Sequence, residues 1–430
     1  MRVRPVILPF ALAATLMFVA SVQARPAKPS KKDHARAAAV LDATPLIDGH
    51  NDLPWQYRKR VKNKLAEIDL HGDQSGLAPS LHSDIARMRQ GKLGGQFWSV
   101  YVPVELETHE AVTATLEQID VVHRLIAAYP KDLALALTAD DIVRIHKEGK
   151  IASLVGMEGG HSIGNSLGAL RMMYRLGARY MTLTHWQPHD WADSATGPPI
   201  HNGLTDFGRA VIAEMNRLGM LIDLSHVSAK VMHDVLDVST APVIFSHSSA
   251  FSLCRHPRNV PDAVLKRVKS SGGVVMVTFV TGFINCKIRR HWAEAKAARA
   301  RLESLHPGDP KRAEASYEAW KKANPTPKAT LSDAADHIDH IRKVAGIDAV
   351  GIGSDFDGIE NTPVGLHDTA AYPALFAELA RRGYDDASLA KIAGGNVLRA
   401  MRAVEAKAAA LQTTEAPGEM WYAPAPATEK

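Results

Sequence analysis

Short apolar runs alternate with longer amphipathic stretches along most of this chain. Valine, isoleucine and leucine dominate the short runs, whereas longer stretches such as HEAVTATLEQIDVVHRLIAAY repeat apolar residues with the spacing of an α-helix. Runs without strict alternation are typical of parallel strands that helices cover on both sides. We count eight predicted strands, at residues 45–50, 95–103, 151–159, 179–185, 220–226, 242–248, 273–279 and 349–358.

Eight strand and helix units in one chain predict a closed barrel. Barrels of the (β/α)8 type extend beyond about 400 residues when they carry insertions, and this chain has 430 residues. An open doubly wound sheet is the alternative, but the G-x-G-x-x-G fingerprint of such sheets is absent after the first strand. We therefore expect an α/β fold, a (β/α)8 TIM-like barrel, over residues 41–410.

Three other segments depart from the barrel pattern. Residues 287–328 are rich in Ala, Lys, Arg and Glu, which predicts two exposed helices inserted between the seventh and eighth strands. Residues 25–40 are predicted to be a linker containing proline and lysine, and residues 411–430 a flexible C-terminal tail. None of these segments carries a motif of its own.

The first 24 residues have the features of a secretory signal peptide. Arg2 and Arg4 precede an apolar stretch over residues 6–19, and Val22-Gln23-Ala24 has the small residues of a cleavage site. The apolar stretch is short for a membrane span. We expect a periplasmic or secreted mature protein without a stable membrane anchor; a homodimer is left open.

Composition and charge indicate an ordinary globular protein. The chain is 46% hydrophobic and 23% charged, with a net charge of +5. Residues 287–328 contain eleven Lys and Arg against five Asp and Glu, so the basic surplus is local. That segment has no nucleic-acid-binding motif, and we expect no nucleic-acid partner.

The two cysteines, Cys254 and Cys286, follow the sixth and seventh predicted strands. Adjacent strands place them on the same side of a barrel, and an oxidising compartment favours a disulfide between them. Two buried free thiols are the alternative. At this chain length a disulfide would be an accessory to a core that folds without it.

Acidic and histidine side chains end six of the eight predicted strands. In a (β/α)8 barrel the carboxyl ends of the strands meet at one face, where active sites are built. A single buried histidine is usually structural, but eight such groups would each need a buried partner. The eight residues are His50, Asp52, Glu158, His185, His226, His247, Asp355 and Asp357.

A metal centre provides that partner. Neutral imidazole and carboxylate oxygen are the ligands of catalytic zinc, and this set is large enough for two ions. Other histidines are treated separately. His337 and His340 have helical spacing but precede the last strand, and we expect a structural role for them. The remaining candidates are isolated and predicted to be solvated: His82, His189, His201 and His367.

Long motifs in this chain resemble the membrane dipeptidase (renal dipeptidase) family of zinc peptidases. The similarity covers residues 40–405 in the expected order, and residues 287–328 are outside it. The motifs are IDGHNDLPW, GMEGGHSIGN, RYMTLTH, WADS, IDLSHVS, PVIFSHSSAFSLCRHPRNVPD, GIGSDFDGI and GGNVLR.

The resemblance implies a role for each matching residue. Two Zn²⁺ ions per chain would be held by His50 and Asp52 on one side, by His226 and His247 on the other, and by a bridging Glu158. His185 would contact the substrate carbonyl region. Arg258 would bind the C-terminal carboxylate of a dipeptide, and Asp355 would move the proton while a metal-bridging hydroxide attacks.

Two positions depart from the family pattern, namely Asp190 and Phe283, and we expect both at the edge of the substrate pocket. Acceptance of a D-residue at the C-terminal position is left open. Two alternative functions also stay open. One is another metal-dependent amidohydrolase of the same barrel type, and the other is a non-catalytic periplasmic peptide-binding protein.

Overall fold

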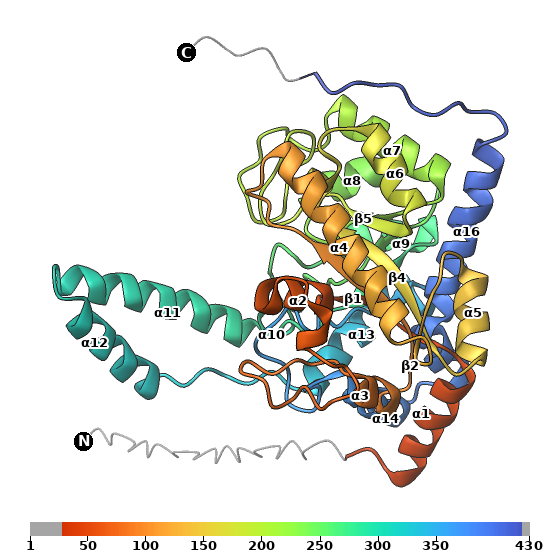
Figure 1. The fold of residues 1–430 in the computed structure, drawn as a ribbon. Coiled ribbons are helices and arrows are strands. Elements are labelled where there is room, and N and C mark those ends of the chain that lie inside the picture. The colour runs from red at the N-terminus through yellow and green to blue at the C-terminus, as the bar shows by residue number, and fades with distance from the viewer. Residues whose placement is uncertain (1–27, 424–430) are drawn as a thin grey trace, which may run out of the picture.

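In the computed structural model, which describes residues 28–423, a closed parallel barrel forms the centre of the protein (Figure 1). The eight barrel strands follow one another in the order β2-β1-β9-β8-β7-β6-β5-β4, and pairing of β2 with β4 closes the ring. Their bounds are β1 Leu46–Asn51, β2 Leu93–Tyr101, β4 Ile151–Glu158, β5 Ala178–Thr182, β6 Leu221–Asp223, β7 Val243–Phe245, β8 Val274–Val277 and β9 Val350–Ile352.

The predicted (β/α)8 barrel is confirmed, and each of the eight predicted strands overlaps an observed one. One strand is additional. β3, Leu133–Leu135, pairs with the first residues of β4, over Ile151 to Ser153, and β5 pairs with the same strand only from Val155 onward. β3 therefore widens the sheet at one end without entering the ring.

Helices surround the barrel, and they cover the outer face of its strands. Every residue of β1, β4, β5, β6, β7, β8 and β9 is buried. The helices are α1 Lys31–Ala43, α2 Leu53–Val61, α3 Ile85–Gln90, α4 Thr108–Ala128, α5 Ala139–Lys147, α6 Leu167–Arg175, α7 Asp206–Leu218, α8 Ala229–Val238, α9 Asp262–Ser271, α10 Thr281–Ile284, α11 Cys286–Leu305, α12 Pro310–Ala323, α13 Leu331–Ala345, α14 Tyr372–Arg381, α15 Asp386–Ala390 and α16 Asn396–Leu411.

Five short turns of tighter or wider helix connect these elements. Two of them lie next to strands: η2 follows β4, and η3 directly precedes β9. They are η1 Leu65–Glu67, η2 Gly160–Ile163, η3 Ile347–Ala349, η4 Thr369–Ala371 and the π-helical η5 Lys391–Gly395.

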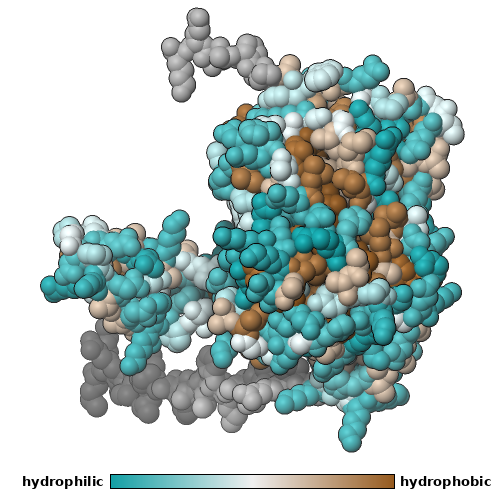
Figure 2. Space-filling model, viewed as in Figure 1, coloured by the Kyte–Doolittle hydropathy of each residue, from teal (hydrophilic) through white to brown (hydrophobic). Residues whose placement is uncertain are grey.

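Helices α11 and α12 form a hairpin that extends away from the barrel between β8 and β9 (Figure 1). Arg299 on α11 pairs with Glu314 on α12 at 2.8 Å, and this ion pair joins the two helices. The surface of the hairpin is mostly hydrophilic (Figure 2). This agrees with the two exposed helices predicted over residues 287–328.

The predicted linker over residues 25–40 is wrong from Lys31 onward, where α1 begins. Ser30 and Asp33 form a capping box at the start of α1, and Val40 and Leu41 are buried. α1 packs against α14, so it is part of the globular body. The segment is rich in Lys and Ala, and this composition indicated a linker. Its few apolar residues nevertheless recur at helical spacing, which composition alone does not show.

The C-terminal segment is held against the barrel over part of its length. The backbone N–H of Gly418 donates to Glu214, and Arg171 donates to the Gly418 carbonyl, each at 3.0 Å. The Tyr422 ring packs edge-on against Phe207 on α7. The tail predicted over 411–430 is therefore fixed as far as these contacts reach, and residues 424–430 lie outside the described range.

The predicted signal peptide over residues 1–24 also lies outside the described residues. Within residues 28–423, no helix combines the length and the apolar character needed to cross a bilayer.

Candidate metal centre

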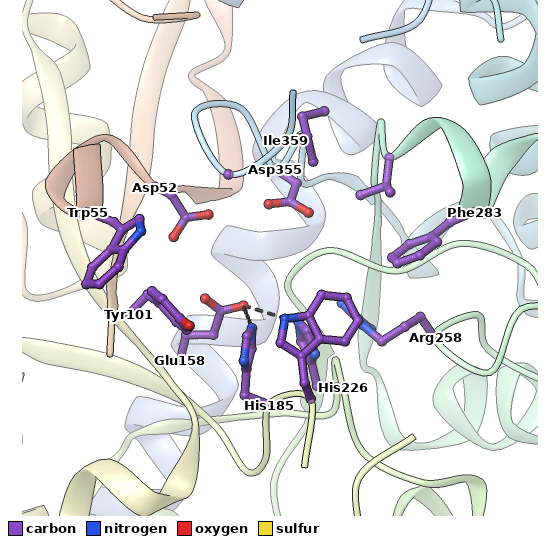
Figure 3. A pocket seen from close by; sticks show the side chains of 13 residues that line it. Asp52, Trp55, Tyr101, Glu158, His185, His226, Arg258, Phe283, Asp355 and Ile359 are labelled. Atoms are coloured by element: carbon purple, nitrogen blue, oxygen red, sulfur yellow. Dashed lines mark ion pairs between the residues drawn. The ribbon is translucent and has the colours of Figure 1, made fainter. Parts of the chain in front are cut away.

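The polar residues predicted at the strand ends converge around one carboxylate. Glu158 is the last residue of β4, and its Oε1 atom faces imidazole nitrogens that come from four other parts of the barrel. Figure 3 shows Glu158 with His185 and His226. The distances from Glu158 Oε1 to the Nε2 atoms are 3.2 Å for His226, 3.5 Å for His50, 3.5 Å for His247 and 3.7 Å for His185.

A second carboxylate extends this cluster on the β1 side. Asp52 Oδ2 lies 3.4 Å from His50 Nε2, and candidate ligand atoms of His50, Asp52 and Asp355 lie within 4.8 Å of one another. Two further triplets meet the same limit, and both contain Glu158: one with His50 and His247, the other with His185 and His226.

These residues fit a metal centre on the evidence of their unpaired atoms. His50 Nε2 and Asp52 Oδ1 are buried and have no hydrogen-bond partner within residues 28–423. Leaving such atoms without a partner is costly, whereas nitrogen and carboxylate ligands together suit zinc. The donor set therefore matches one or more divalent cations between β1, β4, β6 and β7.

Two of the histidine rings are held by a contact at Nδ1, the ring nitrogen that faces away from Glu158. His50 Nδ1 lies 2.8 Å from the hydroxyl of Tyr180 on β5, and His247 Nδ1 lies 2.8 Å from Ser246 Oγ. Hydrogen bonds of this kind set the orientation of metal-ligating imidazoles. In both rings Nε2 is left facing Glu158.

Two of the residues in this cluster have unusual backbone conformations. His226 has φ of 68° and Asp355 has φ of 66°, both in the left-handed region that non-glycine residues seldom adopt. Such conformations cost about 1–3 kcal/mol each and persist where the surrounding structure enforces them, often at functional sites. Both residues come shortly after the end of a barrel strand.

Burial sets the charge state of the imidazoles. It lowers the pKa of His185 and His226 well below its usual range, and the nearby Arg258 adds to this effect. The pKa of His247 is also well below its usual range, through burial and the neighbouring His50. Neutral rings of this kind are ready to act as ligands.

The region around His50 instead favours a positive charge. Burial would lower the pKa of His50, but Tyr180, Glu158 and Asp52 outweigh burial and raise that pKa well above its usual value.

Asp355 is only partly enclosed; desolvation, together with the charges of Asp52 and Glu158, raises its pKa well above the usual range. A bound cation would satisfy the same excess of negative charge.

The cluster forms the floor of a cavity of about 230 Å³. Aromatic and apolar side chains make its walls, as in most small-molecule sites (Figure 3). Glu158, His185, His226, Arg258 and Asp355 line it, as do the wall residues Trp55, Tyr101, Trp186, Val280, Phe283 and Ile359.

Arg258 provides the cationic side of this cavity. Its side chain is almost fully buried, and it donates to Ser248 Oγ at 3.2 Å and to the His247 carbonyl at 3.1 Å. Its Nε–H group is buried without a partner among the described residues. Burial lowers the pKa of Arg258 to about 10, so the group stays charged at neutral pH.

Residues 34–415 match the sequence profile described as membrane dipeptidase, peptidase family M19. The chain belongs to the membrane dipeptidase family. As a member of this family it is a metallopeptidase, and the family assignment confirms the resemblance found in its motifs.

Solved structures agree with the membrane dipeptidase assignment. The probable dipeptidase PvdM from Pseudomonas aeruginosa is 26% identical with a TM-score of 0.75, over 88% of this chain and 99% of that one. Dipeptidase AC, a metallo peptidase of family M19, is 27% identical with a TM-score of 0.70, over 84% and 98%. A metallo peptidase from Rhodobacter sphaeroides, liganded with a phosphinate mimic of the dipeptide L-Ala-D-Ala, is 26% identical with a TM-score of 0.69, over 84% and 99%.

The structure of this membrane dipeptidase family member brings together seven of the eight strand-end residues. Asp357 is the exception, because its Oδ1 atom accepts from the His82 backbone N–H at 2.7 Å. His82 is therefore buried, and the prediction of a solvated ring is wrong for it. It is also wrong for His189, whose ring Nε2 contacts the Leu183 carbonyl at 2.7 Å.

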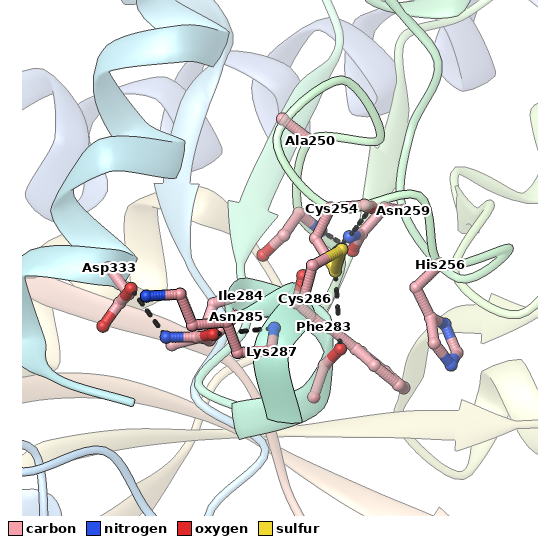
Figure 4. Close-up of a disulfide and its surroundings, with 12 residues drawn as sticks. Ala250, Cys254, His256, Asn259, Phe283, Ile284, Asn285, Cys286, Lys287 and Asp333 are labelled. Carbon is pink, nitrogen blue, oxygen red and sulfur yellow. Dashed lines mark hydrogen bonds between the residues drawn. A yellow bond between two sulfur atoms is a disulfide. The ribbon is translucent and has the colours of Figure 1, made fainter. Parts of the chain in front are cut away.

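The predicted disulfide is present, and it lies beside the loop that carries Arg258 (Figure 4). Cys254 and Cys286 have Cα atoms 5.1 Å apart. Nearby, the Asn259 side chain donates to the carbonyls of Cys254 and Phe283, at 2.8 and 2.7 Å. The disulfide thus ties the Arg258 loop to the start of α11, and Asn259 ties it to α10.

Of the two departures from the family pattern, only Phe283 lies in the cavity. The Arg258 guanidinium carbon lies 5.4 Å from the centre of the Phe283 ring. Asp190 lies outside this cavity and accepts a hydrogen bond from Asn165 at 2.5 Å, so the expectation for Asp190 is wrong. Its place beside the C-terminal segment could not be inferred from the sequence.

Sequence reasoning missed the aromatic wall of the site. Trp55 ends the IDGHNDLPW motif, and Tyr101 ends β2, so both occupy positions next to strand ends. The rings of Trp55 and Tyr101 meet edge to face with centroids 4.8 Å apart. An aromatic residue at a strand end was the available signal.

Proposed function

We propose that this protein is a binuclear zinc dipeptidase that hydrolyses the peptide bond of free dipeptides. One observation carries the proposal: Glu158 Oε1 lies between two sets of candidate ligands, with His50 at 3.5 Å and His226 at 3.2 Å. A single carboxylate in that place suits a bridge between two cations.

The ligands divide into two groups around this bridge. His50 and Asp52 would hold one ion, and His226 and His247 the other, with Glu158 shared. Neutral imidazole and carboxylate donors favour zinc among the common biological cations. When bound, the two ions lower the pKa of an attacking water and polarise the peptide carbonyl.

Substrate binding falls to residues of the cavity wall. Arg258 binds the C-terminal carboxylate of the dipeptide, because its charged fork suits a carboxylate and its Nε–H has no partner among the described residues. His185 contacts the carbonyl oxygen and stabilises the charge that develops there. A cavity of about 230 Å³ favours a dipeptide over a longer chain.

Asp355 moves the proton during the reaction. It accepts a proton from the attacking water and delivers it to the leaving amine. The raised pKa of Asp355 supports this role, because a carboxyl group that binds a proton more readily than usual can act both as base and as acid.

A D-residue at the C-terminal position is included in the proposal. The Rhodobacter sphaeroides relative binds a phosphinate mimic of L-Ala-D-Ala, and it is 26% identical to this chain. We further propose a periplasmic or secreted location, which the disulfide between Cys254 and Cys286 supports. Light scattering on the purified protein decides between a monomer and a homodimer, which the sequence leaves open.

The test is hydrolysis of L,L and L,D dipeptides by the purified protein, before and after chelation. The proposal predicts amine release that chelation abolishes and zinc restores. Cyclic amides, lactones and dipeptides with an amidated C-terminus serve as comparison substrates. Preference for a cyclic substrate would instead assign a different amidohydrolase activity, and binding without hydrolysis would assign a peptide-binding protein.

A further inference from the structure

A buried carboxylate lies behind one of the proposed zinc ligands. Asp223 is the last residue of β6 and is fully buried. Its Oδ1 accepts from the backbone N–H groups of Ser225 and Ser246, at 3.0 and 2.8 Å. Its Oδ2 accepts from the hydroxyls of Thr182 and Ser246, the latter at 2.6 Å. Four donors around one side chain match an ionised carboxylate, which only accepts hydrogen bonds.

These bonds determine where the protons lie. The Ser246 hydroxyl has one proton, and its shortest contact is to the acceptor Asp223. Once that proton is used, only oxygen lone pairs remain toward His247 Nδ1, which lies 2.8 Å from Ser246 Oγ. The contact is a hydrogen bond only if His247 Nδ1 carries the proton. Since a neutral ring holds one proton, His247 Nε2 then has a lone pair facing Glu158.

We propose that Asp223 is a positioning residue that acts through Ser246: it fixes His247 as the Nδ1–H tautomer, with Nε2 ready to bind a cation. The inference rests on the proposed function in taking His247 as a zinc ligand. His226 differs, because its Nδ1 atom has no hydrogen-bond partner in the described part of the chain. Of this pair of ligands, only His247 is fixed by a carboxylate.

Asp223→Asn is the direct test because it reverses the chain of hydrogen bonds. The amide oxygen of the substituted side chain would accept from the same two backbone N–H groups, and its NH₂ group would therefore donate to Ser246 Oγ. The Ser246 proton then turns to His247 Nδ1, and the ring proton moves to Nε2, where it blocks the cation. Nitrogen NMR of histidine-labelled, metal-free protein distinguishes the two tautomers, and a His247→Gln variant assigns the signal.

The same samples are titrated with zinc against a competing chelator. Asp223→Asn is expected to move the His247 proton to Nε2 and to weaken one of two zinc sites about 10- to 100-fold. An unchanged tautomer, or zinc affinity equal to that of the wild type, overturns the proposal. The tautomer is measured in metal-free protein, so the two proposals can fail separately. If the wild-type protein binds no zinc, the proposed function is contradicted, but the tautomer of His247 can still be measured.

Two further variants complete the experiment. Ser246→Ala removes only a hydroxyl, and it is expected to populate both tautomers of His247 and weaken the same zinc site; it decides the matter if Asp223→Asn does not fold. Asp48→Asn is the control. Asp48 is an equally buried carboxylate whose side chain bonds Ser354, Tyr372 and the His50 backbone but no imidazole ring. A tautomer shift of His247 in Asp48→Asn overturns the proposal.

Discussion

The Nε2 atoms of His226 and His247 lie 3.0 Å apart, at the ends of two neighbouring strands. Burial keeps both rings neutral by lowering their pKa values, and both nitrogens lie within 3.5 Å of Glu158 Oε1. Two imidazole nitrogens and a carboxylate directed at one point are an arrangement that a divalent cation stabilises.

Replacing the shared carboxylate is expected to empty the metal centre. Glu158→Gln keeps the size of the side chain but removes the charge that would bridge two cations, so most bound metal and nearly all activity should be lost. Elemental analysis of the purified variant measures this. Glu105→Gln changes an exposed glutamate after β2 and serves as the control. Normal metal content in Glu158→Gln would remove Glu158 from the bridging role.

Asp355→Asn is expected to separate chemistry from metal binding. The amide keeps the shape but cannot take up a proton, so kcat should fall by about 10²–10⁴-fold while zinc content and KM stay close to wild type. Asp357→Asn is the matched control in the same loop, because its side chain bonds the His82 backbone instead of lining the cavity. Loss of zinc in Asp355→Asn would make Asp355 a ligand.

Arg258→Ala is expected to show the opposite kinetic pattern. Removing a charge-assisted contact to the substrate carboxylate should raise KM for free dipeptides about 10- to 150-fold. Dipeptides with an amidated C-terminus have no carboxylate to lose, so their KM should change little. Initial rates over a range of both substrates measure the difference, and an equal rise for both would show that Arg258 does not bind the carboxylate.

His337 is expected to make the stability of the fold depend on pH. Its Nδ1 accepts from the Ala250 N–H at 2.9 Å, and its Nε2 contacts the Ile284 carbonyl at 3.1 Å, so it joins the Arg258 loop to α10. Burial lowers the pKa of His337 to about 4. The unfolded chain, with a histidine pKa of about 6.5, therefore takes up the proton first as the pH falls.

This contribution is fully present above pH 6.5 and is lost as the pH falls toward 4, by up to about 3 kcal/mol. His337→Gln keeps one acceptor and one donor but does not titrate. Urea unfolding at pH 7 and pH 4.5 should therefore show a smaller loss of stability in His337→Gln than in the wild type. His340→Gln, on the same helix, is the control, and an equal loss in wild type and His337→Gln would contradict the assignment.

Much of the site could be predicted because barrel topology converts sequence position into spatial position. A polar residue at the carboxyl end of a buried parallel strand lies at one face, whichever strand carries it, and this rule placed His50, Glu158 and His247 together. Arg258 follows no strand directly. It was found only through family resemblance, since a loop arginine carries no periodic signal.

Other features depend on contacts that a linear pattern does not contain. β3 is three residues long and pairs with only the start of β4, too short for periodicity to detect. The burial of His82 follows from its contact with Asp357, 275 residues away. The Asp223, Ser246 and His247 chain likewise joins two strands, and its direction is set by distances that the sequence does not give.

Zinc titration of the metal-free protein, with dipeptide hydrolysis as the readout, tests the binuclear site most directly. Chelator-treated protein receives zinc in steps of a fraction of an equivalent, and the initial rate on one dipeptide is measured after each step. The account predicts activity that rises to a plateau at two zinc ions per chain. A plateau at one ion, or hydrolysis that persists without any metal, would contradict it.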